Sequence, residues 1–182
     1  LLADKLLDRL GMAGKHPLVG IAPGAAYGPA KRWFPERFAA VADHLIRDEG
    51  ASILLFGSTG DKPAAAAVAR YAAGPLVDIA GQTGLKEAIA VMARCDLFIS
   101  NDSGLMHLAA ALGVPTVAIF GSTNPIATGP VGKRSVIVRR DIDCSPCLKT
   151  DCPTDFRCMD KITADDVLEA ARGLLRQKAE KN

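Results

Sequence analysis

Short apolar runs alternate along the chain with longer segments in which apolar residues recur every three or four positions. The short runs predict β-strands at 18–22, 52–56, 76–79, 97–99, 115–120 and 135–138. The longer segments predict helices that begin at Pro35 and Pro63, helices at 85–94 and 105–112, and a closing helix from Thr163 to about Arg176. This alternation predicts an α/β fold, with a Rossmann-like parallel sheet and helices on both faces.

Residues 1–16 stand apart from this alternation. Leu2, Leu6 and Leu10 are spaced as on one face of a helix, and a glycine follows them. The chain begins Leu-Leu, without methionine and without a signal-peptide pattern. We therefore expect residues 1–16 to be a linker helix from a preceding domain, and residues 17–182 to form one ligand-binding domain.

The segment 97–113, LFISNDSGLMHLAAALG, predicts a buried strand, a tight polar turn and a helix that ends at a glycine. Asn101, Asp102 and Ser103 carry the short polar side chains that cap helices, and Gly104 leaves room for a close approach. A helix start has backbone N–H groups without intrahelical partners and a partial positive charge. We therefore expect a phosphate group to bind at this turn.

The helix after this turn is apolar almost all round, so we expect it to be sandwiched against the sheet with little solvent exposure. His107 is its one ionisable residue and lies about one turn from the helix start. From there its ring would reach a bound phosphate or sugar. The alternative is a core histidine bonded to a neighbouring carbonyl.

Ligands of parallel sheets bind beyond the carboxyl ends of the strands, and glycine-rich or polar loops follow residues 22, 56, 79, 100 and 120. In the first loop, Lys31 and Arg32 follow a stretch rich in glycine and proline. Cations in such a loop suit a diphosphate, and two solvated surface charges are the alternative. The usual glycine-rich signatures of dinucleotide binding and of phosphate-bond hydrolysis are absent from the sequence.

Composition narrows the possible partners. Apolar residues make up 49% and charged residues 23%, as in ordinary globular proteins, and the net charge is +2. With only 5% aromatic residues, a nucleic-acid surface is disfavoured. No apolar stretch is long enough for a transmembrane segment. No carboxylate pair is spaced for Mg²⁺, so we expect no cofactor to be required for activity.

Four of the five cysteines lie in one loop, 141–160. Cys144, Cys147, Cys152 and Cys158 form the pattern C-x2-C-x4-C-x5-C, which is compatible with a tetrahedral structural zinc. Two disulfides or four free thiols are the alternatives. The fifth, Cys95, lies alone in an apolar helix, where we expect an inert core residue.

Two long motifs resemble those of the bacterial ADP-heptose:LPS heptosyltransferases, most closely the type II members. They are PGAAYGPAKRW at 23–33 and NDSGLMH at 101–107, and shorter matches follow the other strands. The resemblance implies a GT-B glycosyltransferase with two Rossmann-like domains, of which this chain is the C-terminal, donor-binding one. It also implies inverting transfer of heptose from ADP-heptose to the inner core of lipopolysaccharide, and a cytoplasmic location, with peripheral attachment to the inner face of the inner membrane as an option.

The resemblance also implies the residues of the site. Lys31 and His107 are the expected catalytic residues. The expected substrate-binding residues are Ala25, Ala26, Tyr27, Lys31, Gly57, Ser58, Gly81, Gln82, Thr83, Asp102, Ser103, Gly104 and His107. The acceptor and a general-base aspartate would belong to the missing N-terminal domain, so we expect the fragment alone to be inactive. A GT-B-like sugar-nucleotide epimerase and a metal-stapled binding module are the alternatives.

Overall fold

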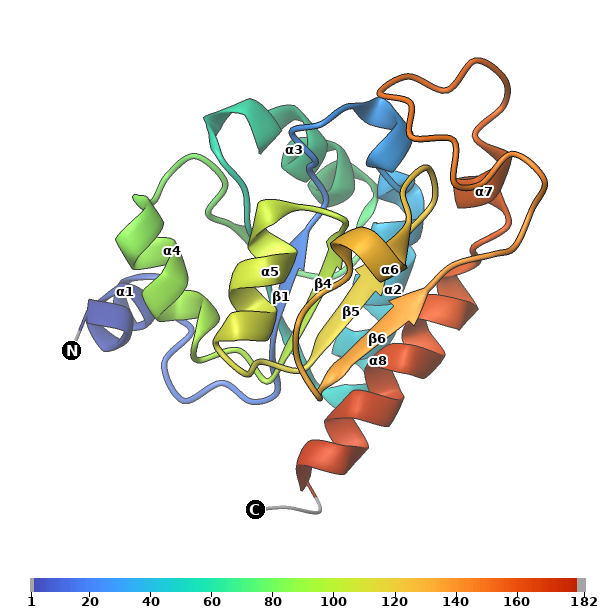
Figure 1. Ribbon diagram of the computed structural model, residues 1–182. Coiled ribbons are helices and arrows are strands. Elements are labelled where there is room, and N and C mark those ends of the chain that lie inside the picture. Colours follow the sequence, from blue (N-terminus) through green and yellow to red (C-terminus); the bar gives the residue numbers. More distant parts are fainter. Residues whose placement is uncertain (1, 180–182) are drawn as a thin grey trace.

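The computed structural model describes residues 2–179 and contains one six-stranded parallel sheet (Figure 1). Its strand order is β3-β2-β1-β4-β5-β6, so the order reverses between β1 and β4. The strands are β1 (Leu18–Ala22), β2 (Ser52–Leu55), β3 (Leu76–Asp78), β4 (Leu97–Asn101), β5 (Thr116–Ile119) and β6 (Ser135–Val138). All six predicted strands are confirmed, and so is the Rossmann-like sheet.

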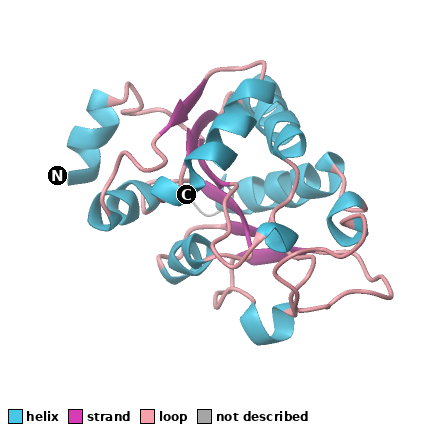
Figure 2. Cartoon of the chain, turned by 90° about the horizontal axis from the view of Figure 1, so that it is seen from above, coloured by secondary structure: helices cyan, strands magenta, loops and turns pink. Residues whose placement is uncertain are grey.

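Helices cover both faces of the sheet (Figures 1 and 2). Three of them pack on one face: α2 (Pro35–Glu49), α3 (Lys62–Tyr71) and α8 (Ala164–Ala179). The other face carries α1 (Leu2–Arg9), α4 (Leu85–Met92) and α5 (Gly104–Ala111). Short helices that the sequence did not predict are η1 (Pro29–Lys31), η2 (Thr59–Asp61), α6 (Pro125–Thr128) and α7 (Arg157–Asp160).

The alternation of side chains along each strand divides the core in two. In β1, Val19 and Ile21 face the α2 and α8 side, whereas Leu18 and Ala22 face the α4 and α5 side. Between them Gly20 is required, because a Cβ there would lie 2.5 Å from the ring of Phe98. The strands β1, β4 and β5 are therefore buried on both faces, which explains their nearly continuous apolar runs, whereas Val136 and Ile137 of the edge strand β6 are exposed.

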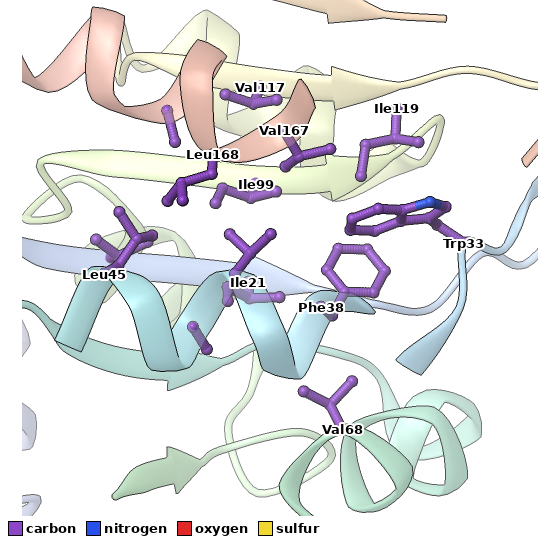
Figure 3. Packing of buried hydrophobic residues seen from close by; sticks show 14 of the residues in the cluster. Ile21, Trp33, Phe38, Leu45, Val68, Ile99, Val117, Ile119, Val167 and Leu168 are labelled. Atoms are coloured by element: carbon purple, nitrogen blue, oxygen red, sulfur yellow. The ribbon is translucent and has the colours of Figure 1, made fainter. Parts of the chain in front are cut away.

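One aromatic pair fixes where the loop after β1 joins α2. Trp33 is buried and its ring centroid lies 5.0 Å from that of Phe38 in an edge-to-face arrangement (Figure 3). The indole N–H donates to the carbonyl of Ile162, at the approach to α8. The loop that carries Lys31 is thus anchored to the core directly after that lysine.

Two predictions about the central segment are wrong. The strand β4 continues through Ser100 and Asn101, both buried and paired with β5, so Asn101 does not belong to the turn. The helix α5 is not sandwiched, because His107 and Ala111 are exposed to solvent. The apolar character of α5 comes mostly from alanine, which is found both inside and outside proteins.

The predicted N-terminal helix is confirmed as α1, and it packs on the domain. Leu6 and Leu7 are buried against the core beneath α4, and Asp4 pairs with Arg94. The division into a linker at 1–16 and a domain at 17–182 stays a prediction; residue 1 and residues 180–182 lie outside the described residues. Among residues 2–179, no helix combines the length and apolar character needed to span a membrane.

Candidate functional site

A cavity of about 630 Å³ opens at the carboxyl ends of the strands, next to the point where the strand order reverses. Parallel sheets bind their ligands at this position. Its walls come from the loops after β1, β2, β3 and β4 and from the starts of α4 and α5. The lining residues are Ala22, Gly24, Ala25, Ala26, Phe56, Gly57, Ser58, Thr59, Asp61, Gly81, Thr83, Leu85, Ala88, Ser103, Gly104, Leu105 and Leu108.

The structure brings most of the predicted site residues together around this cavity. Those that line it are Ala25, Ala26, Gly57, Ser58, Gly81, Thr83, Ser103 and Gly104. Those that do not are Tyr27, Lys31, Gln82, Asp102 and His107. The second group consists of side chains that are paired beside the cavity or exposed to solvent outside it.

Lys31 and Asp102 form a nearly buried ion pair. Lys31 Nζ lies 2.6 Å from Asp102 Oδ2, and the two side chains are only 12% and 4% exposed. The same oxygen accepts hydrogen bonds from the hydroxyls of Thr123 at 2.7 Å and Thr128 at 3.3 Å. The ammonium also lies 4.6 Å from the centre of the Tyr27 ring. The ammonium is thus held at Asp102, two residues before Gly104, the first residue of α5.

The predicted capping role of the polar turn is wrong for all three residues. Asp102 bonds to Lys31 and to the two threonines, and Asn101 accepts from the Trp33 N–H at 3.0 Å while donating to the carbonyl of Pro23 at 2.8 Å. Ser103 occupies the capping position, but its hydroxyl shares a hydrogen bond with Ser100 instead. Within the described residues 2–179, no capping side chain therefore satisfies the first N–H groups of α5, and they remain available to an anion.

Asp61 is a site residue that the motifs did not single out. It accepts hydrogen bonds from the N–H of Ser58 at 2.9 Å and from its hydroxyl at 2.7 Å. A Cβ at Gly24 would lie 2.0 Å from Asp61 Oδ1, and one at Gly57 would lie 2.7 Å from Asp61 Cβ. The two glycines thus allow the carboxylate to lie between the loops after β1 and β2.

An apolar patch inside the cavity was also missed. It consists of Phe56, Leu85, Ala88, Leu105 and Leu108. Leu85 is 64% exposed and lies in this patch, so a ligand in the cavity could cover it. Helical periodicity alone would place Leu85 and Ala88 in the core, because a side chain that faces a cavity has the same spacing as one that faces the interior.

His107 and Gln82 do not line the cavity. His107 is exposed, so the alternative of a core histidine is wrong. Gln82 is exposed and donates to the carbonyl of Asp78 at 2.7 Å. Arg32 is exposed to solvent, and it also donates to the carbonyl of Ala25 at 3.2 Å, so it supports the loop.

The chain matches the family described as glycosyltransferase family 9 (heptosyltransferase) over residues 3–156. It is 42% identical over 141 residues to lipooligosaccharide heptosyltransferase 2 of Haemophilus ducreyi, covering 74% of this chain and 40% of that protein. It is 35% identical over 176 residues to lipopolysaccharide heptosyltransferase 2 of Escherichia coli K12, covering 94% of this chain and 50% of that protein.

Solved structures agree with these relatives. The structure of E. coli ADP-heptose LPS heptosyltransferase II has a TM-score of 0.83 and 32% identity, and covers 98% of this chain and 52% of that one. A family 9 glycosyl transferase from Veillonella parvula also has a TM-score of 0.83, with 31% identity over 96% of this chain and 51% of that one. This chain thus spans about half the length of the proteins it resembles.

Proposed function

The chain belongs to glycosyltransferase family 9, the heptosyltransferases, and from that premise we propose that it is the donor-binding half of an inverting heptosyltransferase. The whole enzyme would move heptose from ADP-heptose to the inner core of lipopolysaccharide. The observation that carries the proposal is the Lys31 ammonium, held by Asp102 beside the uncapped start of α5 at one end of a cavity of about 630 Å³.

The diphosphate of the donor would bind at the start of α5. Ser103 and Gly104 line the cavity there, and the first helical N–H groups favour a negative charge. Lys31 would add a charge-assisted hydrogen bond from the neighbouring loop. These groups would bind the diphosphate and stabilise its developing charge when the bond to heptose breaks.

The adenosine would occupy the opposite part of the cavity. Phe56, Leu85 and Leu108 offer apolar surface to a planar base, and the loop 81–83 lies beside them. Asp61 and Ser58 are polar residues that also line the cavity, and they could bond to ribose hydroxyls. The cavity is thus polar where the phosphates would lie and apolar where the base would lie.

His107 would act together with Lys31 on the reacting group. It is exposed one turn after the start of α5, so its ring could donate a hydrogen bond to the sugar or to the leaving diphosphate. The acceptor and the general base would come from the other half of the protein. The donor-binding half alone would therefore bind ADP-heptose without transferring heptose, and the whole enzyme would work in the cytoplasm at the inner face of the inner membrane.

Calorimetry on the chain and activity measurements on the full-length protein test this proposal. We expect ADP to bind at least about tenfold more tightly than UDP, a difference of roughly 1.4 kcal/mol. The full-length protein should glycosylate an inner-core acceptor and release ADP, whereas the fragment should not. Heptose transfer by the fragment would show that the base lies in this half, and conversion of the donor sugar without an acceptor would favour the epimerase alternative.

A further inference from the structure

The four clustered cysteines lie around one small cavity outside the donor site. Cys144, Cys147, Cys152 and Cys158 all line a space of about 90 Å³ in the loop between β6 and α8, shown in orange at the upper right of Figure 1. All four are free thiols, so no disulfide closes the loop. The donor-binding proposal assigns no role to them.

The wall of this cavity includes a polar group that lacks a partner. Ser122, directly after β5, is 1% exposed, and its hydroxyl has no hydrogen-bond partner within the described part of the chain. Buried hydroxyls are rarely left unpaired, because the loss of hydration costs about 1–3 kcal/mol. The cavity therefore combines four thiols with a wall built to face a polar or ionic group.

Local hydrogen bonds hold one of these cysteines in place. Cys152 Sγ accepts a hydrogen bond from the N–H of Phe156 at 3.3 Å and lies 3.5 Å from the Thr154 hydroxyl.

The cysteine loop is also bonded to the loops that hold Lys31 and Thr123. The carbonyl of Thr150 accepts from the N–H of Ala30 at 2.9 Å, one residue before Lys31. The N–H of Leu148 donates to the carbonyl of Ser122 at 2.8 Å, one residue before Thr123. A change in how firmly the cysteine loop is held would therefore affect the backbone next to Lys31 and the backbone next to Thr123, which bonds to Asp102.

We propose that Cys144, Cys147, Cys152 and Cys158 bind one metal ion, zinc or iron, as four thiolates, and that this ion fixes the loop carrying Lys31. Four sulfur ligands in a tetrahedron suit both metals. Each thiol loses its proton on binding. Among residues 2–179, no three ligand side chains are grouped closely enough to hold a metal as they stand, so binding would draw the thiols together and order the loop.

The metal site is tested on the full-length protein, purified under reducing conditions and incubated with Zn²⁺ or Fe²⁺ before dialysis. We expect about one metal ion per chain by elemental analysis, and sulfur-to-metal charge-transfer bands after replacement with Co²⁺. Cys147→Ser should lose both signals. Cys95→Ala is the matched control, because Cys95 is buried in the other core and should leave both unchanged. Wild-type protein with well under one metal per chain and no such bands would overturn the site.

The effect on Lys31 rests on the proposed function and needs a separate readout. Removal of the metal by a chelator should weaken ADP binding about fivefold or more, and leave adenosine binding nearly unchanged. Equal ADP affinity with and without metal would overturn the coupling between the loops. If the metal-loaded protein binds no ADP at all, the proposed donor site is wrong, whereas the proposed metal site is unaffected.

Discussion

Two buried aspartates flank the central strand β4, and they differ in what their charge is used for. Asp96 precedes the strand and Asp102 follows it, and each pairs with a lysine from a distant part of the chain, Lys178 and Lys31 respectively. Two similar ion pairs thus stand at opposite ends of one strand, and only the pair at Asp102 lies next in sequence to a residue that lines the cavity, Ser103.

The pair at Asp96 closes the amino end of the sheet. Asp96 accepts from the N–H of Leu18 at 2.7 Å, and His16 Nδ1 lies 2.7 Å from the same oxygen. The side chains of His16 and Lys178 are 67% and 29% exposed, so both keep contact with water. This carboxylate joins the beginnings of β1 and β4 and stabilises the fold.

The pair at Asp102 is less exposed to solvent than the pair at Asp96, and the groups that bond to its carboxylate are all side chains. Lys31 is 12% exposed, and the other donors to Asp102 are the hydroxyls of Thr123 and Thr128. A buried charge held beside a cavity is preorganised for an opposite charge in the ligand. The same pair of residue types thus joins the beginnings of β1 and β4 at one end of β4 and holds a nearly buried ammonium at the other.

The largest expected effect is on stability when Asp102 is removed. Asp102→Ala would leave the Lys31 ammonium nearly buried without a counter-charge, which costs about 3–5 kcal/mol. Urea unfolding of wild type and variant would measure it. Asp102→Asn is the shape-matched control. A loss below about 1 kcal/mol would mean that Lys31 escapes to water and that the pair is not held as tightly as its burial indicates.

The next effect is on ligand affinity and concerns the two lysines. Lys31→Ala should weaken ADP binding by about 1.5–3 kcal/mol, the usual contribution of a hydrogen bond to a charged group, and leave adenosine binding unchanged. Lys178→Ala, which breaks the other pair, is the matched control and should change neither. Calorimetry with both ligands measures this. An equal loss for ADP and adenosine would show that Lys31 does not contact the phosphates.

A smaller loss of stability is expected at the amino end of β4. Asp96→Ala would leave the N–H of Leu18 without its acceptor, which costs about 1–3 kcal/mol, while Lys178 and His16 can return to water. Urea unfolding gives the change, and ADP affinity should stay the same. Weaker ADP binding in this variant would mean that the two ends of β4 are coupled, and would contradict a purely structural role for Asp96.

The way in which the free energy of unfolding changes with pH should reveal the contribution of the Asp96 carboxylate. Burial alone would raise the pKa of Asp96, but hydrogen bonds from Lys178, His16 and the Leu18 N–H outweigh it and lower the pKa. Because the folded pKa lies below the unfolded value of about 3.9, this stabilisation is present above that pH and lost as the pH falls through the folded pKa.

Asp96→Asn should therefore lose less stability than wild type between about pH 4 and pH 2. Urea unfolding at a series of pH values would show it. In this variant the free energy of unfolding should still fall as the pH falls, but less steeply. Some dependence remains because the carboxyl of Asp48, beside Arg47, has its pKa lowered to about 2 and contributes with the same sign. Identical slopes would mean that Asp96 does not control the acid sensitivity.

The smallest expected effect is that of Mg²⁺ on ADP binding. Asp102 Oδ2 already interacts with Lys31, Thr123 and Thr128, and Asp61 is occupied by Ser58, so neither carboxylate is free for a metal. ADP titrated in EDTA and in excess MgCl₂ should give affinities that agree within about tenfold, or 1.4 kcal/mol. Stronger tightening by Mg²⁺ would identify one of these carboxylates as a metal ligand.

The strands, the main helices and the edge of the sheet where the cavity opens could all be predicted from the sequence alone. Periodicity and the residues that begin and end helices are local signals, so Pro35 at the start of α2 and Thr163 before α8 could be recognised without a structure. The motifs also identified Lys31 and Asp102 as site residues, although as a cation and a helix cap rather than as a pair.

Which side chains contact each other could not be predicted from the sequence and is known only from the tertiary structure. Lys31 and Asp102 are 71 residues apart, and Trp33 and Asn101 are 68 apart, so these contacts exist only because β1 and β4 lie side by side. Because of the same pairing, Asn101 holds the loop after β1 and does not cap the helix as predicted. A short polar side chain has several equally good partners in sequence terms, and packing alone selects one of them.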